Sequence, residues 1–182
     1  MMKEIYNMVY DTFQNYDEKF DYKIALIDNE FANVSKESKI IDIGCGKGHY
    51  IKHLINSGYG NVLGIEFSSV CSEKYLQTVP HLNVDFLKHC ESIKNKEYEI
   101  CLCMDVLEHI PYDKVEFMVS NIARIGNKAI LGIANHSDIF MGEELHIIQE
   151  NDKWWTSLLK KYFSIVEKIY DKKGKFYLFR CT

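Results

Sequence analysis

Short apolar runs alternate along the chain with longer segments in which apolar side chains recur at helical spacing. This alternation of strand and helix predicts an α/β domain built on a mainly parallel sheet. The predicted strands lie near residues 39–43, 61–65, 82–85, 98–104 and 128–134, and the predicted helices cover residues 49–57, 69–78, 112–125 and 150–161.

The two ends of the chain depart from this alternation. Two further strands, near residues 163–170 and 175–181, are separated only by residues 171–174, Asp-Lys-Lys-Gly. Because so short a connection joins antiparallel neighbours, these strands are predicted to form a hairpin. Residues 3–34 carry apolar side chains at helical spacing, which predicts helices that either cap a ligand pocket or simply pack against the sheet.

The first predicted strand ends in a glycine-rich turn at residues 42–48, Asp-Ile-Gly-Cys-Gly-Lys-Gly. Glycine allows a sharp turn and lets a ligand approach backbone N–H groups, and the helix that follows adds further N–H donors. The turn therefore predicts a nucleotide-like ligand. The dinucleotide fingerprint G-x-G-x-x-G fits poorly, because Gly48 comes one residue early and His49 holds the expected position.

The spacing D-x-G-x-G-x-G, made by Asp42, Gly44, Gly46 and Gly48, instead resembles motif I of the class I S-adenosylmethionine-dependent methyltransferases. The resemblance implies that these residues, with Cys45 inside the turn, bind S-adenosyl-L-methionine and the product S-adenosyl-L-homocysteine.

The same resemblance implies a fold. We expect a three-layer, Rossmann-like α/β methyltransferase fold with sheet order 3-2-1-4-5-7-6 and strand 7 antiparallel. The chain is expected to form one methyltransferase domain over residues 1–182, with an N-terminal helical cap at residues 1–35 and the Rossmann-like core at residues 36–182.

Carboxylates follow the second and third predicted strands. Glu66 lies about 20 residues beyond the glycine turn, where a carboxylate can accept hydrogen bonds from both ribose hydroxyls of an adenosine. This residue supports an adenosine-type ligand without choosing between NAD and S-adenosylmethionine. The resemblance places an acidic side chain, here Asp85, against the adenine amino group, with Phe86 beside the ring. Phe67, next to Glu66, completes this part of the predicted cofactor-binding set.

The segment D-x-L-E-H-I-P at residues 105–111 is a second resemblance to small-molecule methyltransferases, and it assigns Met104 and Asp105 to the cofactor edge. Asp105, Glu108 and His109 are spaced so that one helical turn would place them on one face. His109 could act as a general base. Alternatively, the trio could bind a divalent metal, as in ubiquinone-type O-methyltransferases and small-RNA 3′-end methyltransferases. Because those families carry Glu where Asp105 stands, we predict no metal site.

The segment after the fifth predicted strand supplies further candidates for acceptor-side chemistry. His136 and His146 are candidate bases or hydrogen-bond donors, since the loop after this strand typically lines the acceptor pocket in class I enzymes. Trp154 and Trp155 are adjacent in a predicted helix and point to different faces, so one of them is predicted to lie in the core.

Composition narrows the function classes. The 182 residues carry a net charge of −4 without a basic stripe, which argues against a dedicated nucleic-acid surface. No apolar run approaches the roughly 20 residues of a membrane span, and the N-terminus lacks the order of a signal peptide. We therefore expect a cytoplasmic protein without a membrane partner. Six cysteines form no C-x-x-C pair, so we expect reduced, packed thiols and no zinc site.

These observations predict an enzyme that transfers a methyl group from S-adenosylmethionine to O or N of a small molecule, a sugar or cell-envelope precursor being one acceptor class that fits the resemblance. The alternatives are a metal-dependent RNA 3′-end methyltransferase and a catalytically silent adenosylmethionine-binding module. A nicotinamide-dependent oxidoreductase is disfavoured by the position of Gly48 and by the terminal hairpin. The acceptor and the oligomeric state are left open.

Overall fold

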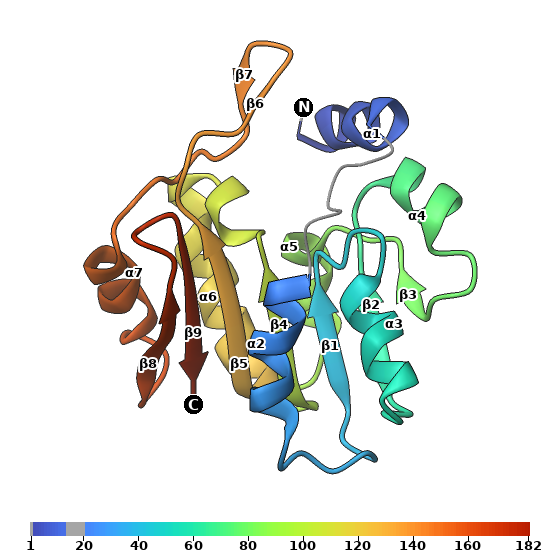
Figure 1. Cartoon of the computed structure of the whole chain (residues 1–182), viewed down its shortest axis with the longest axis vertical. Helices are drawn as coiled ribbons and strands as arrows, with labels where there is room; N and C mark the ends of the chain where they lie inside the picture. The colour runs from blue at the N-terminus through green and yellow to red at the C-terminus, as the bar shows by residue number, and fades with distance from the viewer. Residues whose placement is uncertain (1, 14–20) are drawn as a thin grey trace. The chain divides into compact units, whose positions relative to one another are not determined.

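The computed structural model describes residues 2–13 and 21–182 and divides the chain into two compact units, residues 1–89 and residues 90–182. The first unit contains, in chain order, α1 (Met2–Thr12), α2 (Asp21–Phe31), β1 (Ile40–Ile43), α3 (His49–Asn56), β2 (Val62–Ile65), α4 (Ser69–Tyr75), β3 (His81–Leu82) and α5 (Phe86–His89) (Figure 1).

The three strands of the first unit pair in parallel in the order β3-β2-β1. Every residue of β1 is buried, as expected for a strand covered on both faces. Helix α3 packs closely on β2, because a Cβ built at Gly64 would lie 2.5 Å from Ile51 Cδ1 and 2.6 Å from Cys45 Sγ. Glycine at this position therefore lets the helix that follows the glycine turn approach the sheet.

Helix α1 packs on α4 through an aromatic cluster. Tyr6 and Tyr10 are buried together with Cys71, and Phe67 packs against them with its ring centroid 5.5 Å from that of Tyr6. Asn7 adds a polar contact, since its Oδ1 accepts a hydrogen bond of 2.7 Å from the Ser68 hydroxyl. The two helices predicted within residues 3–34 are thus confirmed over the described residues, whereas their role as a cap stays a prediction.

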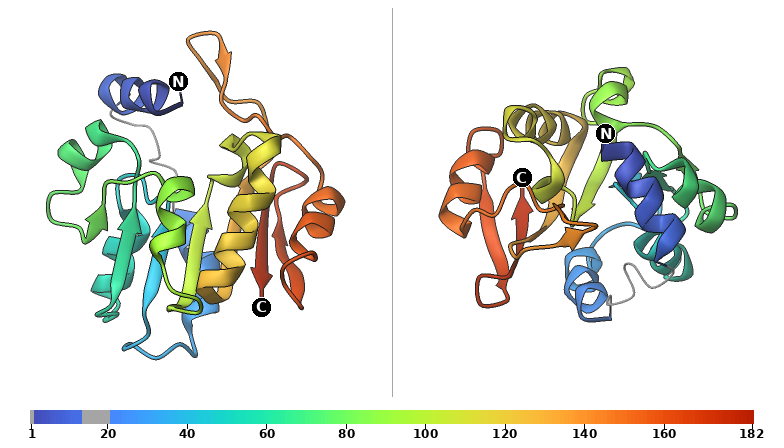
Figure 2. Two further views of the ribbon diagram at one scale, coloured as in Figure 1. Left: turned by 180° about the vertical axis from the view of Figure 1, so that it is seen from behind. Right: turned by 90° about the horizontal axis from the view of Figure 1, so that it is seen from above.

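The second unit contains η1 (Cys90–Ser92), β4 (Tyr98–Met104), η2 (Leu107–His109), α6 (Tyr112–Ile125), β5 (Gly126–Ala134), β6 (Ile139–Phe140), β7 (Glu143–Glu144), α7 (Asp152–Leu159), β8 (Val166–Asp171) and β9 (Phe176–Cys181). Its main strands follow the order β4-β5-β9-β8, with β4 and β5 parallel and β9 antiparallel to both of its neighbours. Helix α6 covers one face of β4 and β5 (Figure 2), and it buries Val115, Met118, Val119 and Ile122 at helical spacing.

The predicted terminal hairpin is confirmed. Strands β8 and β9 are joined by a turn in which Lys173 and Gly174 have positive φ angles. The Gly174 N–H donates a 2.7 Å hydrogen bond to Asp171 Oδ1, which closes the turn.

The expected strand order is reproduced within each unit, as 3-2-1 in the first and as 4-5-7-6 in the second, where β9 and β8 take the places of strands 7 and 6. The prediction for the third strand was partly wrong, because β3 covers residues 81–82 rather than 82–85. Asn83 turns its side-chain amide to the carbonyl oxygens of Glu66 and Ser68, and Asp85 bonds to the first turn of α5. These local bonds compete with the ladder and end the strand early.

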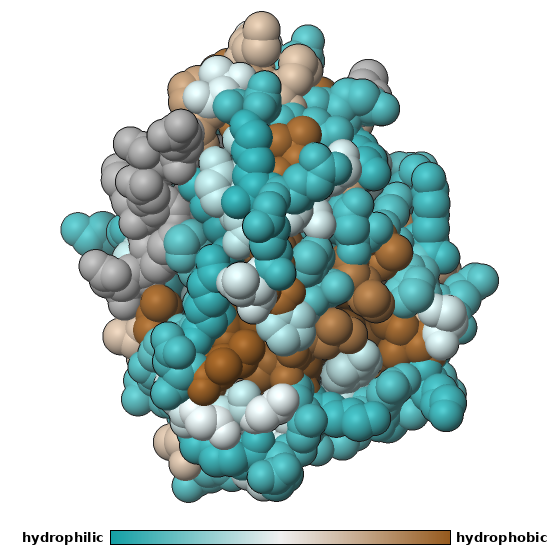
Figure 3. Space-filling view, turned by 90° about the vertical axis from the view of Figure 1, so that its right-hand side faces the viewer, coloured by the Kyte–Doolittle hydropathy of each residue, from teal (hydrophilic) through white to brown (hydrophobic). Residues whose placement is uncertain are grey.

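Two other packing predictions are confirmed. All six cysteines are free and buried, and Trp155 is fully buried while Trp154 is only half-buried. The face drawn in Figure 3 is mostly hydrophilic, with apolar side chains gathered mainly in its lower half. Within the described residues, no helix is both long and apolar enough to cross a membrane.

Candidate functional site

The first part of the site is the glycine turn between β1 and α3. Gly44, Gly46 and Gly48 have φ angles of 73°, 51° and 72°, a region that L-residues with a side chain rarely adopt. At Gly48 a Cβ would also lie 2.8 Å from Leu76 Cδ2 and 3.0 Å from Val79 Cγ1. The turn therefore requires glycine both for its backbone conformation and for close packing.

Asp42 is a buried carboxylate on the strand that leads into this turn. Asp42 is only 1% exposed, and its Oδ2 atom has no hydrogen-bond partner among the described residues. Burial, with a smaller contribution from the nearby Glu66 carboxylate, raises the pKa of Asp42 to about 7. A cationic ligand group next to Asp42 would supply the missing partner and favour the ionised form.

Glu66 closes the other side of the turn. It follows β2, is 3% exposed, and accepts a 3.0 Å hydrogen bond at Oε2 from the Gly46 N–H and a 2.7 Å bond at Oε1 from the Ser68 N–H. One carboxylate thus ties the glycine turn to the loop after β2. Each carboxylate oxygen has a second lone pair, so hydroxyl donors can add to these bonds.

The first unit also contains four other predicted cofactor residues, Cys45, Phe67, Asp85 and Phe86. Asp85 accepts a 3.1 Å hydrogen bond from the Leu87 N–H, and Phe86 is buried. Phe67 packs against α1, as described above. Cys45 is buried, and burial with the nearby carboxylates of Asp42 and Glu66 raises the pKa of its thiol well above the ordinary value, so this cysteine is not a thiolate nucleophile.

The second part of the site begins where β4 ends. Met104 is buried, and its side chain fills the space over Gly132 on β5, where a Cβ would lie 2.5 Å from Met104 Cε. Asp105 has a φ angle of 55°, and its N–H donates a 2.8 Å hydrogen bond to the Gly132 carbonyl oxygen. A non-glycine residue held in this region is a strained position of the kind that clusters at functional sites.

The predicted single face of Asp105, Glu108 and His109 does not form. Only Leu107–His109 makes a helical turn, and Asp105 lies before it in a left-handed conformation. The structure instead groups Glu108 and His109 with His146, and one potential ligand atom from each lies within 4.8 Å of the others. Sequence analysis named all three residues and did not group them, because His146 is brought in from beyond β7.

Backbone carbonyls orient both histidines of this group. His109 Nδ1 lies 2.8 Å from the Leu145 carbonyl oxygen, and His146 Nδ1 lies 2.5 Å from that of His136. Because a carbonyl only accepts, the His146 Nδ1 atom carries the proton in the neutral ring and its Nε2 atom carries a lone pair, whereas the His109 ring also bonds to the Asp105 carbonyl. Glu108 accepts a 2.8 Å bond from the Ala134 N–H.

Burial keeps these rings neutral. Burial and the neighbouring His146 ring lower the pKa of His109 to about 3, and burial also lowers the pKa of His146. An imidazole with so low a pKa stays neutral at neutral pH and accepts a proton poorly, so His109 is the weaker of the predicted bases. His136 differs, because its side chain is exposed and its ring centroid is 4.8 Å from that of His146.

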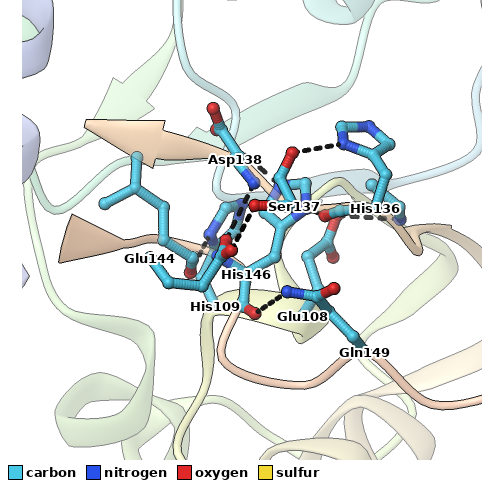
Figure 4. A network of polar contacts seen from close by, with 10 residues as sticks. Glu108, His109, His136, Ser137, Asp138, Glu144, His146 and Gln149 are labelled. Carbon is cyan, nitrogen blue, oxygen red and sulfur yellow. Dashed lines mark hydrogen bonds and ion pairs between the residues drawn. The ribbon is translucent and has the colours of Figure 1, made fainter. Parts of the chain in front are cut away.

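Sequence analysis did not identify Glu144, which makes several hydrogen bonds in the same network (Figure 4). It accepts hydrogen bonds from the Ser137 hydroxyl, the Asp138 N–H and the His146 N–H. The sequence signal available was its position two residues before a candidate histidine, which alone does not indicate such a role.

The amino-acid sequence resembles those of known methyltransferases. The profile of a methyltransferase-domain family matches residues 16–158. Over 89 residues the chain is 30% identical to a ubiquinone biosynthesis O-methyltransferase of Hydrogenovibrio crunogenus; the match covers 45% of this chain and 36% of that enzyme's length.

Solved structures share the fold. A TehB-like S-adenosylmethionine-dependent methyltransferase from Corynebacterium glutamicum has a TM-score of 0.70 at 17% identity, covering 100% of this chain and 97% of that one. A magnesium protoporphyrin IX methyltransferase from Synechocystis with bound S-adenosylmethionine has a TM-score of 0.67 at 16% identity, covering 98% and 95%. The predicted Rossmann-like methyltransferase fold is therefore confirmed.

Proposed function

Because the chain belongs to the class I S-adenosylmethionine-dependent methyltransferases, we propose that it transfers a methyl group from this cofactor to an oxygen or nitrogen atom of a small molecule. The observation that carries the proposal is the pair of buried carboxylates, Asp42 and Glu66, at a turn built from three glycines with positive φ. A buried carboxylate atom without a hydrogen-bond partner among the described residues fits a ligand with an ammonium group.

Each residue of the first unit has a proposed part in holding the cofactor. Asp42 accepts hydrogen bonds from the ammonium of the methionine moiety, and the turn at residues 44–48 packs against that moiety. Glu66 accepts from the ribose hydroxyls while it keeps the Gly46 and Ser68 N–H groups bonded. Asp85 accepts from the adenine amino group, and Phe86 packs beside the ring. Met104 and Asp105, at the end of β4, stay predictions for the cofactor edge.

S-adenosylmethionine supplies a methyl group already activated on a sulfonium, so the protein's task is to align the acceptor, and positioning of this kind can supply several kcal/mol. For a hydroxyl acceptor the protein also removes a proton. We assign that role to His136, whose exposed ring is not buried like those of His109 and His146.

The affinity for cofactor is expected to depend on pH through Asp42. Its pKa of about 7 in the ligand-free protein lies above the ordinary value, so the protonated carboxyl stabilises the ligand-free fold and stability falls as the pH rises toward 7. An ammonium ligand needs the ionised form. Between about pH 6 and pH 7.5, calorimetry should therefore show roughly eightfold tighter binding of S-adenosylhomocysteine.

The matched control for this pH dependence is Asp42→Asn, which should bind more weakly and with an affinity independent of pH over the same range. Equal affinity of the wild-type protein at both pH values would contradict the ammonium contact.

The acceptor class is tested by incubating the protein with methyl-labelled S-adenosylmethionine and three sets of acceptors: small hydroxyl and amine compounds that include sugar precursors, RNA with a free 3′ end, and no acceptor. Label in a small molecule supports the proposal. Label only in RNA would support the alternative function, that of an RNA 3′-end methyltransferase. Cofactor binding without transfer to any acceptor would favour a catalytically silent binding module.

A second candidate function, metal-dependent methyl transfer, is supported by the group Glu108, His109 and His146. One carboxylate and two neutral imidazoles fit a divalent transition metal or zinc, and the His146 ring has the Nδ1–H bond to a carbonyl that is typical of ligating histidines. A metal bound there would supply Lewis-acid activation of an acceptor hydroxyl.

This second candidate predicts that the protein binds Mn²⁺ and that His146→Ala weakens the binding at least tenfold, since it removes one of three ligands. His136→Ala is the control, because it removes a neighbouring ring and keeps the backbone carbonyl that orients His146. Electron paramagnetic resonance titration measures both. Equal Mn²⁺ binding by wild type and His146→Ala would exclude the group as the site.

A further inference from the structure

The segment between β5 and α7 contains a very small hairpin. Strands β6 and β7 have two residues each and pair only as Ile139 with Glu144 and Phe140 with Glu143. Two-residue strands make too few ladder bonds to fix a loop by themselves. Residues 136–146, which we call the histidine loop, therefore need other contacts to hold their conformation.

Glu144 supplies those contacts. Its Oε1 atom accepts 2.8 Å and 3.0 Å hydrogen bonds from the N–H groups of Asp138 and His146, and its Oε2 atom accepts a 2.5 Å bond from the Ser137 hydroxyl. These bonds, with a further one from the Gln149 side chain, lower the pKa of Glu144 to about 2, so the carboxylate is ionised at neutral pH. One charged group thus joins both ends of the histidine loop.

The carbonyl groups that contact the two buried histidines belong to residues that neighbour Glu144 or one of its partners in the chain. The His136 carbonyl, just before Ser137, accepts from His146 Nδ1, and the Leu145 carbonyl, just after Glu144, lies 2.8 Å from His109 Nδ1. Figure 4 shows Glu144 beside Ser137, Asp138 and His146 in this network. Moving either end of the loop would move a carbonyl away from its histidine.

We propose that Glu144 is a positioning residue that holds His146 as the Nδ1–H tautomer with the Nε2 lone pair available for chemistry. Glu144 acts through the loop and needs no contact with cofactor or acceptor. The inference rests on the second candidate function only in assuming that the His146 Nε2 atom serves methyl transfer; the tautomer itself is measured without it.

The test is long-range ¹H–¹⁵N NMR of histidine-labelled protein, which reports the protonated nitrogen of each ring. Wild type should show His146 as the Nδ1–H tautomer. Glu144→Ala should leave His146 exchanging between tautomers and should lower kcat about tenfold, an effect typical of groups that orient functional histidines. Glu144→Gln, which keeps one acceptor oxygen, should partly restore both the His146 tautomer and kcat. Glu143→Ala is the matched control and should change neither.

Three results would overturn the proposal: an Nε2–H tautomer at His146 in the wild type, an unchanged His146 signal in Glu144→Ala, or an equal change in Glu143→Ala. If Glu144→Ala fails to fold, Ser137→Ala removes one of the carboxylate's bonds and should give a smaller shift in the same direction. An unchanged kcat in Glu144→Ala with the His146 tautomer altered would count against the proposed function of this histidine and not against the positioning by Glu144.

Discussion

Replacing Glu66 by alanine is expected to weaken the binding of S-adenosylhomocysteine about 100-fold, because hydrogen bonds to a charged group contribute roughly 1.5–3 kcal/mol each. The substitution removes the acceptors proposed for the ribose hydroxyls. It also leaves the N–H groups of Gly46 and Ser68 without their buried partner. The glycine turn should then lose its fixed conformation, so the loss of affinity comes from both the ligand and the turn.

Calorimetric titration of Glu66→Ala beside Glu73→Ala measures this effect. Glu73 lies on α4 close by in the chain, with an exposed side chain, and its removal should leave the dissociation constant unchanged. Wild-type affinity in Glu66→Ala would show that this carboxylate is not part of the cofactor site.

Gly48→Ala is expected to lower the free energy of unfolding by about 3 kcal/mol, since a positive φ angle and a steric overlap each cost roughly 1–3 kcal/mol. The φ angle is 72°, and the new Cβ would lie 2.8 Å from Leu76 Cδ2 and 3.0 Å from Val79 Cγ1. Because Gly48 directly precedes α3, relief of the overlap would shift the start of this helix and disturb the turn.

Two other glycines separate the cost of the backbone conformation from the cost of the steric overlap. Gly58 has a φ angle of 91° and only Lys36 Cδ near its would-be Cβ, at 3.9 Å, so Gly58→Ala should cost about 1 kcal/mol from the backbone alone. Gly60 has nothing within 4 Å of a would-be Cβ, and Gly60→Ala should change stability by no more than about 0.5 kcal/mol. Chemical denaturation measures all three variants, and equal stabilities for Gly48→Ala and Gly58→Ala would contradict the packing argument.

The sequence predicted most of the fold, because its longest strands and helices carry clear periodic patterns. Strand β4 and helix α6 occupy the predicted ranges, 98–104 and 112–125. Strand β3 was predicted three residues too long at its end, since Asn83 and Asp85 are compatible with an extended run until their side chains bond to nearby backbone. Strands β6 and β7 were missed because two-residue strands carry no periodicity.

The turn between the missed strands β6 and β7 also could not be predicted from the sequence. Met141 and Gly142 both have positive φ angles, which is the geometry of a tight two-residue hairpin turn. Methionine is an unusual residue there, so the sequence lacks the asparagine or aspartate before glycine that would have indicated the turn.

The sequence was enough to identify the residues around the glycine turn but not the group of Glu108, His109 and His146. Asp42, the three glycines and Glu66 follow strand ends at motif spacing, so local pattern was enough to name them. The group of Glu108, His109 and His146 depends on a long loop that returns to η2, and its hydrogen bonds to backbone carbonyls have no signature in the sequence. Local spacing instead suggested Asp105 as a partner, which is not one of the three residues that the structure groups.

The central claim is that the glycine turn with Asp42 and Glu66 binds S-adenosylmethionine, and its most direct test is a calorimetric titration of the purified protein with S-adenosylhomocysteine, with NAD⁺ titrated in parallel. The account predicts micromolar binding of S-adenosylhomocysteine at a 1:1 ratio, a free energy of about −8 kcal/mol, and no binding of NAD⁺. Binding of NAD⁺ alone, or of neither compound, would contradict it.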